Sequence, residues 1–163
     1  MRAFTLVEIM ISTVILSIFM VGLYVVLNTG ETTYYTDTGL LILQQQARHA
    51  IDRMVKELRN AAAPTISDSS RKITFNTKTE NNVKYYLDTT NNRIMRQVDT
   101  GTPQVVANYV TALTFCCYSD TTSTCTSTCT DSNLAEILLT ASSRFAKKDS
   151  SFSLKGQARM RNE

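Results

Sequence analysis

The sequence predicts an α+β protein in which a long N-terminal helix packs on an antiparallel β-sheet. Three observations lead to this prediction. No charged residue occurs from Ile9 to Gly30. Between Gln44 and Asn60, apolar residues recur at three- and four-residue steps, as on one face of a helix. After Pro64 the apolar period changes to two, which is typical of strands with one buried face. A helix followed by a run of strands indicates the α+β class.

The apolar run from Ile9 to Leu27 is long enough to cross a membrane. As a helix it would measure about 28 Å, close to the hydrocarbon thickness of a bilayer. No A-x-A-like cleavage site follows Leu27, so we expect the segment to be retained. Arg2 precedes the run, and Glu31 and Asp37 follow it. The positive-inside rule then places the N-terminus in the cytoplasm and the bulk of the chain across the membrane.

Glu8 is unusual because it lies at the start of this apolar run. A carboxylate near a membrane is costly unless a positive group meets it. Two interpretations are open. Glu8 rests in the headgroup layer, as in many membrane helices, or it is there to meet a partner.

The stretch from Ala3 to Met10, with the sequence AFTLVEIM, resembles the prepilin-type cleavage and methylation motif. This motif occurs in type IV pilins and in the pseudopilins of type II secretion systems. The resemblance implies that a prepilin peptidase cuts between Ala3 and Phe4 on the cytoplasmic side and that the new amine of Phe4 is methylated. It further implies that Glu8 pairs with the Phe4 amine of a neighbouring subunit in a filament.

The chain departs from the family pattern in two ways. The family usually has Gly where this chain has Ala3, and the leader from Met1 to Ala3 is very short. A start upstream of Met1 and a trimmed N-terminus are both compatible with that length. The partners that the resemblance implies are other pilin or pseudopilin subunits, the prepilin peptidase, an inner-membrane assembly platform and membrane lipid. It implies a single pass through the inner membrane, a periplasmic C-terminal domain and later a place in a pilus at the cell surface.

We divide the chain into four parts: a leader (1–3), a membrane-spanning and filament-core helix (4–30), an amphipathic helix continuing into the domain (31–63), and a β-rich domain (64–163). Helix propensity is low between Leu27 and Gln44. We expect the helix to continue there with local weakness near Gly22 or Gly30, although a short linker between two helices is an alternative. The stretch 46–61 also resembles minor pilins related to PilW and the J-type pseudopilin.

Alternating apolar residues predict the strands of the domain, and turn residues separate them. A Ser- and Thr-rich loop is expected over 120–133. The expected strands are Ile73–Phe75, Val83–Leu87, Ile94–Val98, Val105–Phe115, Leu134–Ala141 and Phe152–Met160.

The four cysteines, Cys116, Cys117, Cys125 and Cys129, lie at a strand end and in the following loop. Oxidising conditions outside the cytoplasm favour disulfides. Adjacent residues of a strand point to opposite faces, so we expect Cys116 and Cys117 each to join one of the other two. Each bridge would add roughly 2–4 kcal/mol by restricting the unfolded chain. A zinc site is the alternative, but one adjacent pair and one C-x-x-x-C do not make two chelating knuckles.

The sequence offers little for catalysis, so we expect no enzyme, metal or cofactor. His49 is the single histidine, and no G-x-S-x-G, H-E-x-x-H or phosphate-binding loop occurs. Asp52 and Glu57 are five residues apart, which favours two solvated charges over a catalytic pair. The basic residues lack interleaved aromatic side chains, so nucleic acid is not expected as a partner.

The leading hypothesis is therefore a structural subunit, in particular a minor pilin that primes or caps a type IV pilus. One alternative is a minor pseudopilin of a type II secretion system. A single-pass membrane-anchored binding module is the other.

Overall fold

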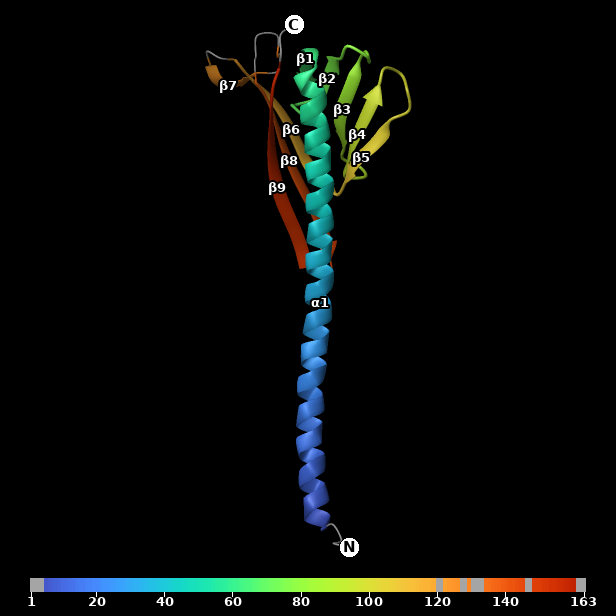
Figure 1. Ribbon diagram of the computed structural model, residues 1–163, viewed down its shortest axis with the longest axis vertical. Coiled ribbons are helices and arrows are strands. Elements are labelled where there is room, and N and C mark those ends of the chain that lie inside the picture. Colours follow the sequence, from blue (N-terminus) through green and yellow to red (C-terminus); the bar gives the residue numbers. More distant parts are fainter. Residues whose placement is uncertain (1–4, 120–121, 127–128, 130–133, 146–147, 161–163) are drawn as a thin grey trace.

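The computed structural model describes residues 5–119, 122–126, 129, 134–145 and 148–160. Within them, one helix, α1 (Leu6–Arg59), precedes all the strands. Figure 1 shows that the C-terminal half of α1 carries two β-sheets, whereas its N-terminal half extends alone away from them. The chain is thus an α+β protein with a long apolar N-terminal helix packed on antiparallel sheets, as the sequence predicts.

The helix α1 is continuous through its glycines and its threonine-rich middle. Thr5 caps its N-terminus, where the hydroxyl oxygen accepts a 3.4 Å hydrogen bond from the Glu8 N–H. The hydroxyls of Thr29, Thr32, Thr33 and Thr36 each donate to the carbonyl four residues earlier, which satisfies them within the helix. No linker separates two helices in this region; the helix passes from the apolar run into the domain without a break.

The first sheet is a five-stranded antiparallel meander. The helix ends at Arg59, and the chain enters this sheet at Ala62, so the last residues of the expected helical segment 31–63 form a strand. Its strands, in both sequence and spatial order, are β1 (Ala62–Ser67), β2 (Lys72–Asn76), β3 (Val83–Asp88), β4 (Arg93–Val98) and β5 (Gln104–Asn108).

The second sheet has four strands in the order β7-β6-β8-β9. It was not separated from the first in the sequence-based prediction, which placed one sheet beside the helix. The long hairpin of β8 and β9 extends along α1, as Figure 1 shows. The strands are β6 (Val110–Ser119), β7 (Thr122–Thr126), β8 (Leu134–Phe145) and β9 (Lys148–Arg159).

Tyr109 separates the two sheets. We expected one strand over Val105–Phe115, but Tyr109 has a φ of 62° and divides it into β5 and β6. A positive φ reverses the extended course of a strand, so the chain leaves the first sheet at this residue. The Tyr109 carbonyl then accepts a 2.9 Å hydrogen bond from the Ser142 N–H of β8, which ties the turn to the second sheet.

One face of α1 forms the core with both sheets. Buried helix residues such as Leu43, Met54 and Leu58 are fully covered. The closest approach is at Gly156 of β9, where an added Cβ would lie 2.5 Å from Cγ2 of Ile51. A side chain at position 156 would therefore push the helix off the sheet, since interiors are close-packed.

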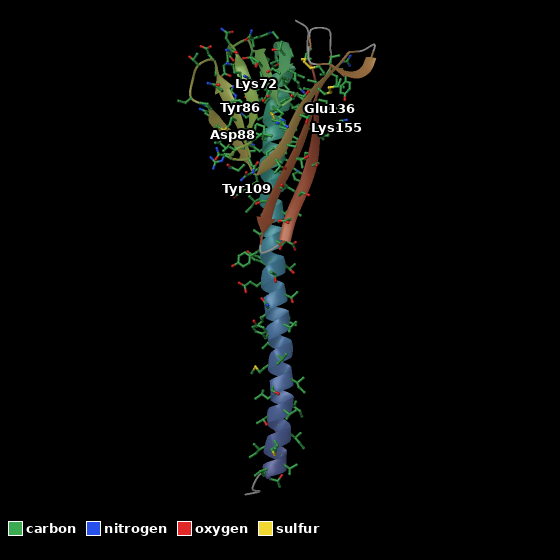
Figure 2. The ribbon with its side chains drawn as sticks, turned by 180° about the vertical axis from the view of Figure 1, so that it is seen from behind. Lys72, Tyr86, Asp88, Tyr109, Glu136 and Lys155 are labelled. Carbon is green, nitrogen blue, oxygen red and sulfur yellow. A yellow bond between two sulfur atoms is a disulfide. The ribbon has the colours of Figure 1, made fainter. Side chains whose placement is uncertain are left out.

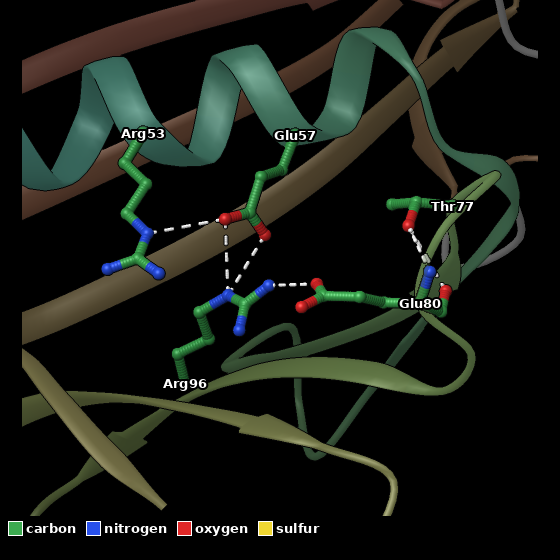
Figure 3. A network of polar contacts seen from close by, with 5 residues as sticks. All are labelled: Arg53, Glu57, Thr77, Glu80 and Arg96. Atoms are coloured by element: carbon green, nitrogen blue, oxygen red, sulfur yellow. Dashed lines mark hydrogen bonds and ion pairs between the residues drawn. The ribbon is translucent and has the colours of Figure 1, made fainter.

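A polar network joins α1 to the first sheet (Figure 3). Arg96 of β4 is only 8% exposed, and its Nε donates to both carboxylate oxygens of Glu57 at 3.1 Å. Its Nη2 donates to Glu80, and Arg53 Nε lies 3.2 Å from Glu57 Oε1. Burial opposes the charge of Arg96, yet the hydrogen bonds to Glu57 and Glu80 raise its pKa. Glu57 is therefore a helix-to-sheet contact and not the solvated charge we expected.

Candidate functional site

The N-terminal half of α1 exposes a continuous apolar surface. Every residue from Thr5 to Tyr35 is exposed, and the first buried helix residue is Gly39. Phe19 is 65% exposed and Val26 is 67% exposed. Leaving a side chain of this kind in water instead of burying it costs roughly 1.5–3 kcal/mol. So large an apolar surface requires a lipid or protein cover.

The length and polarity of this segment suit a membrane. The helix is long and apolar enough near its N-terminus to cross one, by length and composition. The span from Leu6 to Leu27 would measure about 33 Å, and a bilayer core is about 30 Å thick. The hydroxyls of Ser12, Thr13 and Ser17 donate to helix carbonyls at 2.8, 2.9 and 2.7 Å. These three hydroxyls therefore need no water.

Glu8 lies in the first turn of this exposed helix. The first turn carries the positive end of the helix dipole, which favours a carboxylate there. Glu8 itself is exposed, and no cation forms an ion pair with it in the described part of the chain. The next basic residue that the structure describes is Arg48, far along the helix. The other two expected processing residues, Ala3 and Phe4, lie outside the described residues.

Residues 1–24 match the prokaryotic N-terminal methylation motif. This methylation motif spans Ala3, Phe4 and Glu8, together with most of the exposed apolar helix. It is confined to the N-terminus, so it describes the anchor and leaves the β-rich domain unassigned. No curated protein sequence matches this chain.

The four cysteines form two disulfides at one end of the second sheet. Cys116 of β6 joins Cys125 of β7, with 5.3 Å between the Cα atoms, and Cys117 joins Cys129, with 5.4 Å. This pairing is one of the two that the alternation of adjacent strand residues left open. Cys117 and Cys129 are buried, whereas Cys125 is exposed, so the two bridges differ in access to solvent.

The described residues contain no group of three or more His, Cys, Asp and Glu side chains arranged to hold a metal ion. His49 and Asp52 are exposed on α1, and Glu57 is engaged with Arg96. Sequence reasoning missed Arg96 and Glu80. Arg96 occupies an inward position of β4 beside Ile94, and an ionisable residue at such a position was the available signal that it needed a buried partner.

Proposed function

We propose that this chain is a subunit of a type IV pilus-like filament, assembled through the exposed half of α1 and acting as a minor pilin that primes or caps it. The observation that carries the proposal is the methylation motif on an apolar helix that the domain leaves entirely uncovered. A bilayer covers this surface before assembly, and neighbouring helices of the same kind cover it afterwards.

The chemistry of processing supplies a partner for Glu8. A prepilin peptidase cuts between Ala3 and Phe4 and leaves a methylated ammonium on Phe4. In the filament, Glu8 pairs with this ammonium of a neighbouring subunit. A carboxylate and an ammonium in an apolar setting offset each other's desolvation only when they are paired. The pair therefore favours one axial position of each new subunit.

The proposed location follows from the same elements. The helix crosses the inner membrane once, and the β-rich domain lies in the periplasm before it moves into the filament. The two disulfides support a position outside the cytoplasm, because oxidising compartments favour them. The partners are other pilin or pseudopilin subunits, the prepilin peptidase, the assembly platform in the inner membrane, and lipid.

Two alternative functions would use the same N-terminal membrane helix. A minor pseudopilin of a type II secretion system would undergo the same processing, and the filament that takes up the chain distinguishes it from a minor pilin. A membrane-anchored binding module would undergo no cleavage before Phe4.

Mass spectrometry of the N-terminal peptide of the membrane-extracted protein tests the proposal. We expect a peptide that begins with N-methylated Phe4. A matched sample from cells without the prepilin peptidase should retain Ala3. Recovery of an uncleaved N-terminus from cells that have the active peptidase would contradict the proposal and favour the anchored binding module.

A further inference from the structure

The first sheet has an outer face that the described part of the chain leaves partly open to solvent. Alternate residues of its strands, such as Tyr85 and Ile94, are buried in the core. The residues between them point to the opposite face, because successive side chains of a strand alternate. None of these outward residues is fully buried where the structure describes it. Figure 2 shows Lys72, Tyr86 and Asp88 together on this sheet.

One outward residue from each strand lines up across this face. Met95 lies opposite both Tyr86 and Val105, and Tyr86 lies opposite Lys72, which in turn lies opposite Ser67. We call these five residues the outer row. Neighbouring strands are about 4.8 Å apart, so the outer row spans roughly 19 Å. It joins three apolar side chains to a lysine in a single line across the sheet.

Positive charge is in excess beside the outer row. Lys84 precedes Tyr86 by two residues on β3 and is the diagonal neighbour of Lys72, so their Cα atoms lie roughly 7–8 Å apart. Neither lysine forms an ion pair within the described residues. Asp88 is the acidic residue at an outward position of the described strands, and it lies opposite Arg93. It therefore leaves the charge of the two lysines uncompensated.

We propose that the outer row and Lys84 form a binding surface for an acidic polysaccharide. This inference goes beyond the proposed function and does not depend on filament assembly. A sugar ring has a face of C–H groups that packs on an aromatic ring, which Tyr86 supplies. Lys72 and Lys84 then meet the carboxylates of the sugar in charge-assisted hydrogen bonds.

Neighbouring polar side chains suit the hydroxyl groups of a sugar. Thr74 and Gln97 lie opposite Lys84 on either side, and both are half-buried on the same face. A hydroxyl and a carboxamide each donate and accept hydrogen bonds, as sugar hydroxyls do. A polymer that follows the outer row would therefore meet an aromatic ring, two ammonium groups and these neutral polar groups.

Two other classes of partner fit this face less well. Single-stranded nucleic acid is held by aromatic side chains on which successive bases stack, whereas Tyr86 is the one aromatic residue of the outer row. A stable protein interface buries about 800 Å² on each partner around an apolar core. Tyr86, Met95 and Val105 form a single line, which is narrow for such a core.

Binding of the full-length chain in detergent to immobilised polygalacturonate tests the inference. Dextran, which has no charge, is the comparison polysaccharide. We expect the chain to bind polygalacturonate and not dextran. Added salt should weaken the binding, because it screens contacts between exposed charges.

Variants locate the surface. Lys72→Glu combined with Lys84→Glu should raise the dissociation constant for polygalacturonate about tenfold, because attraction becomes repulsion. Tyr86→Ala should raise it about fivefold through loss of the ring. Arg48→Glu combined with Lys56→Glu is the matched control, since it makes the same change of net charge at two exposed residues of α1. That control should keep a dissociation constant near the wild-type value. Formation of both disulfides verifies that each variant is folded.

Each result decides for or against the inference. It would be overturned by unchanged binding in both variants of the face, by an equal loss in the α1 control, by equal binding of dextran, or by no binding of the wild-type chain to polygalacturonate. Tighter binding of a single-stranded DNA oligonucleotide, lost in the same variants, would also overturn it and assign the face to nucleic acid. The filament proposal is tested separately, at the N-terminus of the processed chain.

Discussion

At the scale of single residues, Glu8 gains little from the fold of its own chain. Its carboxylate forms no ion pair with the described residues. The hydrogen bond at the helix cap uses its backbone N–H and not its side chain. Its side chain costs free energy beside an apolar run unless a cation arrives from outside. The assembly role that we propose for Glu8 would supply such a cation, whereas the described residues do not.

Glu8→Ala should separate these two demands. We expect the variant to insert in the membrane and to form both disulfides, because its side chain makes no contact in the domain. Its recovery in sheared filaments should fall at least tenfold. Ser12→Ala is the control within the same helix, since it removes only a hydroxyl that bonds its own backbone. Equal incorporation of both variants would argue against a role for the carboxylate in assembly.

At the scale of elements, the two disulfides fasten β7 and the segment that holds Cys129 to the end of β6. Both start from adjacent residues, so one bridge leaves from each face of the strand. Cys117 is fully buried and Cys129 nearly so, while Cys125 is exposed. Access of a reductant to the two bridges should differ accordingly.

Mild reduction should open the Cys116–Cys125 bridge first. In a titration with dithiothreitol, alkylation followed by peptide mapping should label Cys125 before Cys129, because the second bridge lies in the core. Replacing both Cys117 and Cys129 by Ser should lower the free energy of unfolding by about 2–4 kcal/mol. Simultaneous labelling in the folded protein, at every reductant concentration, would show that burial does not protect the second bridge.

The elements also show what the sequence pattern could predict. Periods of 3.6 and 2 correctly indicated the helix and most strands, because burial of one face imposes them. The division at Tyr109 was not predictable in this way, since Val105–Phe115 contains no Gly or Pro and Tyr is not a residue that usually marks a positive φ. Strand β7 was missed because it lies in a Ser- and Thr-rich stretch without apolar alternation.

In the candidate site, too, the sequence predicted the local features and missed the contacts between distant elements. The apolar run and Glu8 are local in sequence, so the methylation motif was visible there. Contacts between distant elements were not: Arg96 and Glu57 are 39 residues apart and meet only when the sheet packs on the helix.

At the scale of the whole molecule, the network around Arg96 holds the first sheet to α1. Arg96 connects Glu57 of the helix with Glu80 of the β2–β3 connection, so three segments meet at one guanidinium. Nearby, burial raises the pKa of Tyr85, and the charge of Glu57 raises it further. A low-polarity setting of this kind makes an unpaired charge costly.

Arg96→Met should lower the free energy of unfolding by about 2–3 kcal/mol, less than for a fully buried pair, because Glu57 and Glu80 retain some exposure. Urea unfolding of the full chain in detergent, followed by circular dichroism, measures the change. Lys155→Met is the matched control. Lys155 lies 2.7 Å from Glu136 on the outer face of the second sheet and is 54% exposed, so its loss should matter far less (Figure 2). Similar losses for the two variants would contradict the importance assigned to the network.

The unbroken course of α1 has a mechanical consequence. One hydrogen-bonded rod extends from the cap at Thr5 to Asn60, and both sheets are attached to its side. Tension along the rod therefore passes through the helix backbone, while the strands bear little of it. The stretch around Gly30, which no side chain of the domain braces, is the part that should lengthen first under load. Extension there would absorb a pull before any strand separates.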